Sequence, residues 1–403
     1  MSRRVAMELL GIGAAACALG EGGWASAGGS SRIATIDVFP VRYPMRGRFK
    51  FFEGPDGSPI GRPAVLVRIA DDTGIIGWGE SVPIPKWSDE TLETVTTTIR
   101  KYLAPELIGR DPADIQGAHA VMDRSIAPAF STGQPIAKAG VDIALHDLVA
   151  RKRGMNVTTL WDRTPGPALT LSWTLNPRTL DEIDGLIVAG RALGYRHFNV
   201  KVAPDPEFDL ALCRKVKADI PDGFLWADAN CGYDVDTALA VAPKLADVGV
   251  AVLEAPLRPN HIAGYQALAR QAALPIVMDE GIVSADELVE FIRLRMLDGV
   301  AMKPARCGGL LMARRQIDIV NDAGLMWLAS GLTDPDVSLA ATLAPFSSMG
   351  QVRPSALNGP QFLAHSVVDQ PLVPKDGQLA PPTGAGLGVT VNADKLRAIA
   401  ATD

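Results

Sequence analysis

Five short apolar segments with the pattern of β-strands recur along the middle of the chain, and each ends in a charged residue. They cover residues 198–201, 224–228, 250–254, 276–279 and 299–303. Their ends lie 27, 26, 25 and 24 residues apart, with helical stretches between them. This repetition is typical of a parallel sheet, in which each strand needs a crossover connection before the next.

Seven or eight such units between residues 169 and 353 predict an α/β protein whose strands close into a modified (β/α)8 TIM barrel. An open, doubly wound parallel sheet is the alternative. No glycine-rich phosphate-binding loop follows any of the strands, and this disfavours a nucleotide ligand.

The part of the chain before the barrel has a different pattern. Residues 33–39 and 64–70 are short β-like runs that fit an antiparallel meander, and a turn sequence follows at residues 71–74. Residues 91–99 and 136–148 repeat apolar side chains with helical spacing. We therefore expect an N-terminal α+β region.

Residues 1–28 have the features of a twin-arginine export signal. Arg3 and Arg4 precede a mostly apolar stretch that is interrupted by Glu8, and the small residues 25–27 form a candidate cleavage site. We expect cleavage after Ala27 and a periplasmic or exported protein; the alternative is an ordinary N-terminus and a cytoplasmic protein. No other uncharged apolar run approaches the ~20 residues of a membrane span, so we expect no membrane contact in the mature form.

The charge balance favours a small-molecule function. The formal net charge is -6, from 39 Lys and Arg against 45 Asp and Glu, so the chain offers no basic field for phosphates and we expect no nucleic-acid partner. The four cysteines show no metal-ligand or disulfide spacing.

Three of the strand ends carry carboxylates: Asp228, Glu254 and Asp279. In a barrel the carboxyl ends of all strands open on one face, where active sites lie. Three carboxylates on neighbouring strands repel one another unless a cation lies between them, and oxygen ligands suit Mg²⁺ or Mn²⁺. We therefore predict a divalent metal at these residues, with Glu280 as the alternative third ligand or as a partner of the ligands.

Lys201 and Lys303 flank the carboxylates on either side of the ring. This placement suits proton removal on one face of a metal-bound compound and proton delivery on the other. A structural reading is that each acidic residue caps the next helix and each lysine is solvated. Five charged residues at five successive strand ends favour the catalytic reading.

Several segments together resemble the enolase superfamily, in its branch of mandelate racemase and muconate-lactonizing enzymes. They are residues 74–80 (GIIGWGE), 139–147 (AGVDIALHD), 199–201 (NVK), 228–230 (DAN), 253–256 (LEAP), 278–280 (MDE), 303–309 (KPARCGG) and 384–388 (GAGLG). The resemblance implies an α+β capping domain at residues 29–155, a barrel at 156–360 and a C-terminal segment, 361–403, that packs back on the cap. It also implies a homo-oligomer.

Carried over by motif, Lys201 matches the second lysine of the family's Lys-x-Lys, and Lys303 matches the opposite lysine of the muconate-lactonizing subgroup. The His-Asp dyad of the mandelate-racemase subgroup is absent, and the five histidines are expected to pack or lie at the surface. Asn199 stands in place of the first lysine. Asn358 stands in place of an aspartate that dipeptide epimerases use to hold an ammonium group, which disfavours that reaction.

Four residues are predicted to bind substrate: Asn199, Asn230, Asp334 and Arg48. Asp334 belongs to the sequence Thr-Asp-Pro-Asp, which is also a good turn sequence, so a turn is the equal alternative. Arg48 lies in the segment 46–52 that matches the mobile loop with which such a cap closes over the barrel.

The predicted function is Mg²⁺-dependent removal of the proton α to a carboxylate of a small molecule, through an enediolate. The resemblance implies this chemistry, because enzymes of this superfamily pair a lysine or histidine base with Mg²⁺. Lysines on both faces favour a racemase, epimerase or cycloisomerase over an acid-sugar dehydratase. A non-catalytic carboxylate-binding barrel is the rival of a different class.

Overall fold

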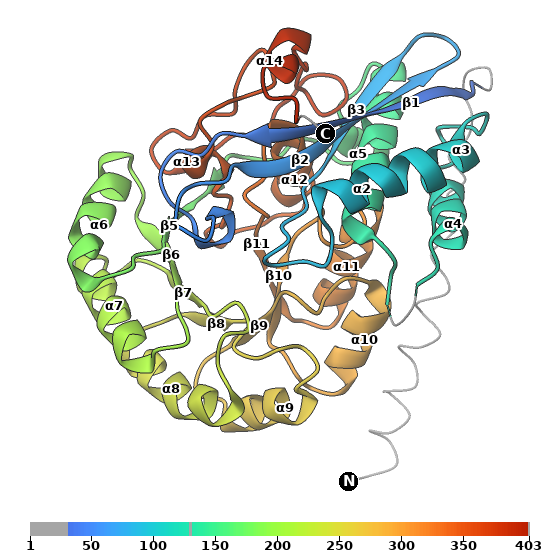
Figure 1. Ribbon diagram of the computed structural model, residues 1–403. Coiled ribbons are helices and arrows are strands. Elements are labelled where there is room, and N and C mark those ends of the chain that lie inside the picture. Colours follow the sequence, from blue (N-terminus) through green and yellow to red (C-terminus); the bar gives the residue numbers. More distant parts are fainter. Residues whose placement is uncertain (1–30, 129–130, 402–403) are drawn as a thin grey trace, which may run out of the picture.

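The computed structural model describes residues 31–128 and 131–401, which form a barrel with a smaller cap over its mouth (Figure 1). The predicted export signal lies outside the described residues. No helix in the described ranges is long and apolar enough to cross a membrane.

The cap is built on an antiparallel sheet of three strands in the order β1-β2-β3. The turn between β2 and β3 forms because Asp71 Oδ1 accepts hydrogen bonds from the amides of Thr73 and Ile75, both at 3.0 Å. Helix α5 covers the sheet. The elements are β1 (Ile33–Tyr43), β2 (Arg62–Asp71), β3 (Ile76–Ser81), α2 (Leu92–Thr98), a π-helical turn (Ile99–Leu103), α3 (Ala104–Leu107), α4 (Ile115–Ser125) and α5 (Pro135–Lys152).

Two glycines set the close approach of α5 to the sheet. A Cβ built on Gly79 of β3 would overlap the carbonyl oxygen of Gly140 in α5, and a Cβ on Gly140 would overlap the hydroxyl of Ser81. The glycines of two family motifs therefore serve packing, since any side chain here would force the helix off the sheet.

The barrel contains seven parallel strands in the order β11-β10-β9-β8-β7-β6-β5. Helices ring its outside (Figure 1). The strands are β5 (Ser172–Leu175), β6 (His197–Lys201), β7 (Leu225–Asp228), β8 (Val252–Glu254), β9 (Ile276–Met278), β10 (Gly299–Met302) and β11 (Met326–Ala329). The outer helices are α6 (Ile183–Ala192), α7 (Pro206–Asp219), α8 (Val235–Val248), α9 (Ile262–Gln271), α10 (Ala285–Arg293), α11 (Leu310–Asp322) and α12 (Asp336–Ser348).

Two residues take the place of an eighth strand and close the ring. Ser355 bridges to Leu171 at the β5 side, and Ala356 bridges to Ser330 at the β11 side. The amide of Ser355 donates to Thr170 O at 2.8 Å, and the amide of Ala356 donates to Ala329 O at 2.8 Å. The predicted closed barrel is confirmed, and the open sheet is wrong.

The C-terminal segment packs against the cap and also reaches the barrel. Its helices α13 (Gly359–Phe362) and α14 (Ala393–Arg397) lie beside the cap sheet in Figure 1, and Ala400 bridges to Val41 of β1. A further strand, β12 (Gln378–Leu379), pairs antiparallel with β4 (Leu169–Thr170). Short 3₁₀ turns lie at Lys50–Phe52, Val157–Trp161 and Leu180–Glu182.

Buried carboxylates in α5 join the cap to the rest of the molecule. Asp142 accepts from the amide of Leu310 at the start of α11, and its Oδ2 lies 2.7 Å from His119 Nε2. His146 packs beside it, with Nδ1 3.3 Å from Asp142 Oδ1. These histidines are buried packing residues, as predicted. Within the described ranges, Cys213, Cys231 and Cys307 are free thiols.

Asp147, one turn further along α5, joins the cap to the C-terminal segment. Its Oδ2 accepts from the amide of Trp78 in β3 at 2.8 Å, and its Oδ1 accepts from the amide of Leu387 at 2.7 Å. The motifs at residues 139–147 and 384–388 therefore serve the junction of cap, barrel and C-terminal segment.

Candidate active site

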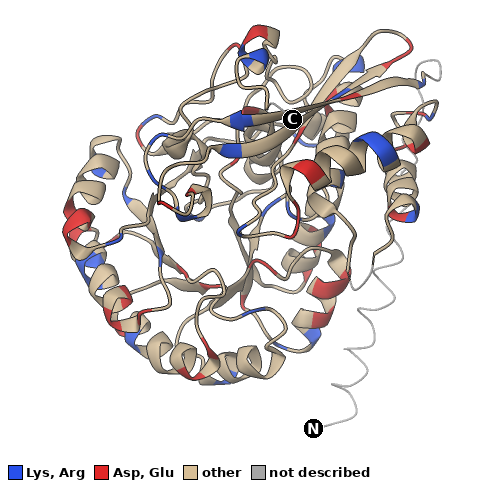
Figure 2. Ribbon diagram, in the orientation of Figure 1, with Lys and Arg blue, Asp and Glu red and all other residues tan. Residues whose placement is uncertain are grey.

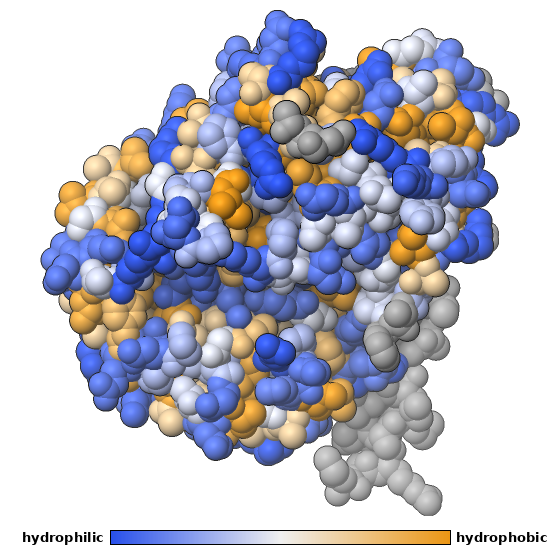
Figure 3. Space-filling view, viewed as in Figure 1, coloured by the Kyte–Doolittle hydropathy of each residue, from blue (hydrophilic) through white to orange (hydrophobic). Residues whose placement is uncertain are grey.

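The strand ends bring the predicted charged residues to the face that the cap covers. Lys201, Asp228 and Glu254 are the last residues of β6, β7 and β8, and Asp279 and Lys303 directly follow β9 and β10. Figure 2 shows acidic and basic residues at these ends, below the cap. Hydrophilic residues also follow the boundary between cap and barrel on the surface in Figure 3.

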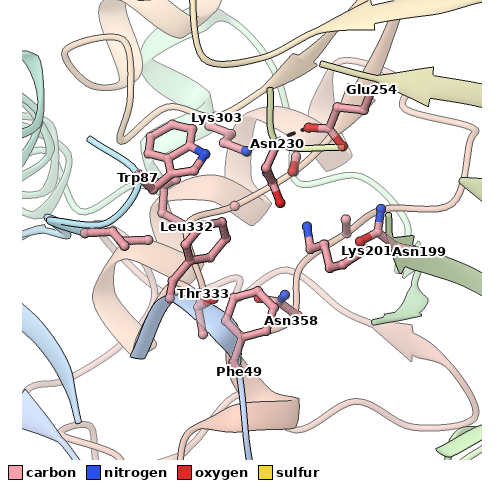
Figure 4. A pocket seen from close by; sticks show the side chains of 15 residues that line it. Phe49, Trp87, Asn199, Lys201, Asn230, Glu254, Lys303, Leu332, Thr333 and Asn358 are labelled. Carbon is pink, nitrogen blue, oxygen red and sulfur yellow. Dashed lines mark ion pairs between the residues drawn. The ribbon is translucent and has the colours of Figure 1, made fainter. Parts of the chain in front are cut away.

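A narrow pocket with a cavity volume of about 30 Å³ lies at this mouth (Figure 4). The barrel supplies polar and charged groups, and the cap supplies aromatic rings. The lining residues are Phe49, Phe51, Ile84, Trp87, Asn199, Lys201, Asn230, Glu254, Lys303, Ser330, Gly331, Leu332, Thr333, Ala356 and Asn358. The cap rings exclude water from the charged end, and this strengthens every electrostatic interaction there.

Both lysines are held by carboxylates of neighbouring strands. Lys201 Nζ donates to Asp228 Oδ2, and Lys303 Nζ donates to Asp279 Oδ2. Lys303 Nζ also lies 3.9 Å from Glu254 Oε1. Burial alone would lower the pKa of Lys303, but the charges of Asp279 and Glu254 outweigh it, so its pKa lies above the usual value.

Glu254 is the central carboxylate of the three and has the fewest partners. It is buried, and its Oε1 has no hydrogen-bond partner in the described part of the chain. Burial first, and then the charges of Asp228 and Asp279, raise its pKa well above the usual value. The pKa of Asp228 moves the other way, because Lys201 and other nearby lysines outweigh the effect of its burial.

The oxygen donors of Asp228, Glu254 and Asp279 are of the chemical type that a divalent cation prefers. An unpartnered buried oxygen lies between two further carboxylates, and a dication relieves such repulsion. In the described structure the oxygens of Asp228 and Asp279 face ammonium or guanidinium groups, and no three His, Cys, Asp or Glu side chains of the described ranges converge as metal ligands do. An ion here therefore competes with the lysines for the same oxygens.

Glu280 also reaches the site. Because β9 ends at Met278, strand alternation no longer sends residues 279 and 280 to opposite faces. Glu280 Oε1 accepts from Trp87 Nε1 at 2.9 Å and from Asn230 Nδ2 at 3.3 Å, while its Oε2 has no partner among the described residues. Burial and then the charge of Asp279 raise the pKa of Glu280 to about 7.

The structure brings Asn230 and Asn199 into the pocket but not Arg48. Asn230 Nδ2 donates to Asp228 Oδ2 at 3.2 Å, beside the carboxylates. Arg48 instead donates to Glu53 Oε1 and to Asn176 O, each at 2.6 Å, and so fastens the cap loop to the barrel rim. Arg48 is not among the residues that line the pocket, and its guanidinium has acceptors outside it, so its contact with substrate stays a prediction.

Asp334 lies beneath the pocket wall rather than in it. Its Oδ1 accepts from the amide of Leu332 at 3.3 Å and from the hydroxyl of Ser338 at 3.1 Å, and its Oδ2 accepts from Thr342 Oγ1 at 3.3 Å. The turn reading therefore describes Asp334 in this structure, and substrate binding by Asp334 stays a prediction. Its neighbour Thr333 lines the pocket.

Two buried arginines support the site and were missed by the sequence analysis. Arg62 of β2 donates to Val82 O at 2.9 Å and Leu332 O at 2.8 Å, so one side chain holds two loops of the pocket wall. Arg306 donates to Asp279, and to Ile282 O at 2.7 Å. The family motif at residues 303–309 contains Arg306 and could have identified it. No sequence motif marks Arg62.

A capped barrel with lysines and carboxylates at successive strand ends defines the enolase type of enzyme. Two family models match: the mandelate racemase / muconate lactonizing enzyme N-terminal domain over residues 57–161, and the enolase C-terminal domain-like model over residues 186–395. The chain belongs to the mandelate racemase/muconate lactonizing enzyme family of the enolase superfamily.

Relatives of this family are similar along nearly the whole chain. A chloromuconate cycloisomerase of Cupriavidus necator is 32% identical over 90% of this chain and 96% of its own length. An N-succinyl-L-Arg/Lys racemase of Bacillus cereus is 25% identical over 91% of this chain and 97% of its own.

Solved structures give the same result. Muconate lactonizing enzyme from Pseudomonas fluorescens, complexed with muconolactone, superposes with a TM-score of 0.86 at 25% identity, over 92% of this chain and 100% of that one. The predicted family, fold and isomerase class are confirmed.

Proposed function

We propose that the pocket forms and protonates an enediolate of a small carboxylate. A racemase or epimerase forms it by removing the α proton and then adds a proton on the opposite face; a cycloisomerase forms it by ring closure of a second carboxylate onto a double bond and then adds a proton at the α-carbon. The observation that carries the proposal is the placement of two lysines around Glu254. Lys201 enters from β6 and Lys303 from the end of β10, and both line one pocket with Glu254 of β8 between them.

We propose Asp228, Glu254 and Asp279 as ligands of Mg²⁺, with Mn²⁺ as a substitute and Glu280 beside them. The ion would bind substrate carboxylate oxygen and stabilise the negative charge of the enediolate. Asn230 holds Asp228 in place and joins it to Glu280. Trp87 covers this end from the cap.

One lysine serves as the base on its side of the bound compound, and the other lysine serves as the acid on the opposite side. A base must lose its proton near neutral pH, yet Asp279 and Glu254 hold the pKa of Lys303 above its usual value. Positive charge among these carboxylates lowers that pKa, so the reaction is expected to depend on the metal.

The two rival functions differ in what they need. A dehydratase needs an acid positioned on a β leaving group, and no histidine of the described ranges lines the pocket. A binding protein needs no base on either face, whereas here Lys303 is buried, Lys201 is partly buried, and both line the pocket. The cycloisomerase and racemase relatives support the isomerase.

The test is hydrogen exchange at the α-carbon in D₂O, followed by NMR. The protein is incubated with N-acyl amino acids, acid sugars, proline derivatives and lactones, with Mg²⁺ or with EDTA. Exchange that needs Mg²⁺ and inverts the α-carbon supports the proposal. Opening of a lactone to the unsaturated acid would assign a cycloisomerase, loss of a β-hydroxyl would assign a dehydratase, and tight binding without exchange would assign a binding protein.

We also propose that the chain is exported and assembles as a homo-oligomer. The support for export is the sequence of residues 1–28, and the support for assembly is the family. Fractionation of cells that express the full chain checks the first, and light scattering on the purified protein checks the second.

A further inference from the structure

Each of the two lysines that line the pocket lies over one aromatic ring of the cap. Lys303 Nζ is 4.8 Å from the centroid of the Trp87 ring, and Lys201 Nζ is 5.8 Å from the centroid of the Phe49 ring. Both rings line the pocket, and Figure 4 shows Trp87 beside Lys303 and Phe49 toward Lys201. An ammonium group within about 6 Å of a ring centroid is attracted by the electron-rich face of the ring. The cap therefore contributes one cation–π contact to each lysine.

The two rings belong to different connections of the cap. Phe49 directly precedes the 3₁₀ turn Lys50–Phe52, between β1 and β2, whereas Trp87 lies between β3 and α2. The lysines are also well separated, since the strands β7, β8 and β9 lie between β6 and β10 in the sheet. One ring and its lysine can therefore be changed while the other pair stays in place.

Phe49 is held against Lys201 by other aromatic rings. It is buried and stacks on Phe362 of α13, with centroids 4.7 Å apart and an angle of 26° between the planes. An edge-on contact with Phe51, at 5.5 Å between centroids, fixes it from another side. This packing leaves the ring one orientation, so the fold and not the lysine sets its position.

Trp87 is held over Lys303 by a hydrogen bond to the barrel. Its Nε1 donates to Glu280 Oε1 at 2.9 Å, and its amide donates to Ile84 O at 2.8 Å. The edge of the indole thus contacts Glu280 while the ring lies next to the ammonium group of Lys303. Because a hydrogen bond is directional, this contact fixes the plane of the ring that Lys303 meets.

An aromatic ring orients an ammonium group without competing for its proton. An ammonium group has three donors, and the described structure gives each lysine one hydrogen bond, from Lys201 to Asp228 and from Lys303 to Asp279. The ring occupies a second direction and leaves the rest of the ammonium group for the pocket. Proton transfer depends on such alignment, because small errors in position are costly in rate.

We infer that Phe49 and Trp87 are positioning residues for the two faces of the reaction: Phe49 orients Lys201, and Trp87 orients Lys303. The inference rests on the proposed function, because it takes each lysine to serve one face of the bound compound. It differs from a general role in excluding water, since loss of a ring that only excludes water would slow both faces alike.

The test is exchange of the α-hydrogen in D₂O with Mg²⁺, measured separately for each enantiomer of a compound that wild type exchanges. Lys303→Ala and Lys201→Ala identify which enantiomer depends on which lysine. Trp87→Leu should lower kcat about tenfold for the enantiomer that depends on Lys303 and leave the other within about twofold of wild type. Phe49→Leu should do the reverse.

Three further variants separate positioning from folding. Trp87→Phe keeps a ring over Lys303 but loses the indole N–H, so it should recover most of the rate that Trp87→Leu loses. Phe362→Leu removes the stacking partner of Phe49 and should slow the same enantiomer as Phe49→Leu. Tyr102→Leu, at an exposed aromatic residue of the cap, should change neither enantiomer.

A second measurement does not depend on activity. The ligand-free proteins are treated with formaldehyde and cyanoborohydride, and mass spectrometry of peptides gives the initial rate of methylation at each lysine. Because each substitution uncovers one ammonium group, Trp87→Leu should raise this rate at Lys303 alone, and Phe49→Leu should raise it at Lys201 alone.

No slowing, or equal slowing of both enantiomers, in Trp87→Leu would overturn the inference, and so would equal losses in Trp87→Phe and Trp87→Leu. This pair decides the question even if Phe49→Leu does not fold. Parallel or unchanged methylation of both lysines would overturn it as well. Failure of the proposed function is recorded separately, as no exchange of any compound by wild type; selective methylation would then uphold the placement of the rings and refute their role in proton transfer.

Discussion

Glu254 Oε1 lies 3.9 Å from Lys303 Nζ and has no hydrogen-bond partner in the described part of the chain. The distance is too long for a hydrogen bond, so the buried carboxylate of Glu254 is only partly neutralised. Lys303 instead donates to Asp279, which Arg306 also contacts. The arrangement is costly to the fold, and such costs concentrate at functional sites.

Glu254→Gln should lower the affinity for Mg²⁺ and raise the stability of the ligand-free protein. The substitution keeps the shape of the side chain and removes a buried charge that Asp228 and Asp279 repel. We expect the ligand-free variant to melt a few degrees higher than wild type, and its Mg²⁺ affinity to fall about 100-fold or more. Thermal melting with and without Mg²⁺ measures both; equal affinity for Mg²⁺ in the two proteins would remove Glu254 from the ligand set.

Lys303→Ala should bind Mg²⁺ more tightly than wild type. The ammonium group occupies an oxygen of Asp279 and repels a cation, so its removal frees a ligand and lowers the positive charge. Coulomb energies at these distances predict a gain of about tenfold or more in affinity. Calorimetric titration checks this against Lys244→Ala on the outer helix α8, which should bind like wild type. Weaker binding by Lys303→Ala would mean that the lysine and the ion do not share oxygens.

Asp142→Asn should flatten the dependence of stability on pH. Burial alone would raise the pKa of Asp142 and lower that of His146, but the charge of each on the other reverses both shifts. His146, whose pKa is raised, contributes fully below about pH 6.5 and loses its contribution as the pH rises through the raised value. Asp142, whose pKa is lowered, contributes above about pH 4 and loses its contribution on further acidification.

The melting temperature of wild type should therefore fall more between pH 6 and pH 9 than that of Asp142→Asn. At pH 6, Asp142→Asn should be less stable than wild type by about 3 kcal/mol. Melting curves at pH 5, 6, 7.5 and 9 measure this, with the exposed Asp72→Asn as control. Parallel curves for wild type and Asp142→Asn would show that the pair is not ionised in the fold.

Arg62→Met should loosen the pocket wall but leave the predicted catalytic residues unchanged. Methionine fills much of the volume but leaves the carbonyls of Val82 and Leu332 without their donor. We expect a loss of about 2–4 kcal/mol in stability and a rise in KM that exceeds the change in kcat. A fall in kcat at unchanged KM would point to a direct catalytic contact instead.

The sequence predicted the barrel and its charged strand ends because both follow from local patterns. Apolar runs ending at Lys201, Asp228 and Glu254 coincide with β6, β7 and β8. Local patterns could not predict the eighth strand, because it consists of Ser355 and Ala356 alone. It forms only through bridges to Leu171 and Ser330, which belong to other parts of the chain.

The roles of Arg48 and Asp334 depend on partners that periodicity does not reveal. Glu53 and the carbonyl of Asn176 hold Arg48 outside the pocket, and hydroxyls of α12 hold Asp334 below it. Arg62 belongs to the cap but acts on barrel loops 270 residues away in sequence, so only the assembled fold identifies it. Charged residues at strand ends were thus predictable, whereas residues that act across the interface between cap and barrel were not.

The most direct test of the two-lysine account is hydrogen exchange resolved by enantiomer. Each enantiomer of the compound that exchanges fastest is incubated in D₂O with Mg²⁺ and wild type, Lys201→Ala or Lys303→Ala. We predict that each variant loses exchange of one enantiomer by about 10³-fold, keeps exchange of the other, and that the two variants lose opposite enantiomers. Equal loss of both enantiomers in both variants, or full exchange in either, would contradict the assignment of one lysine to each face.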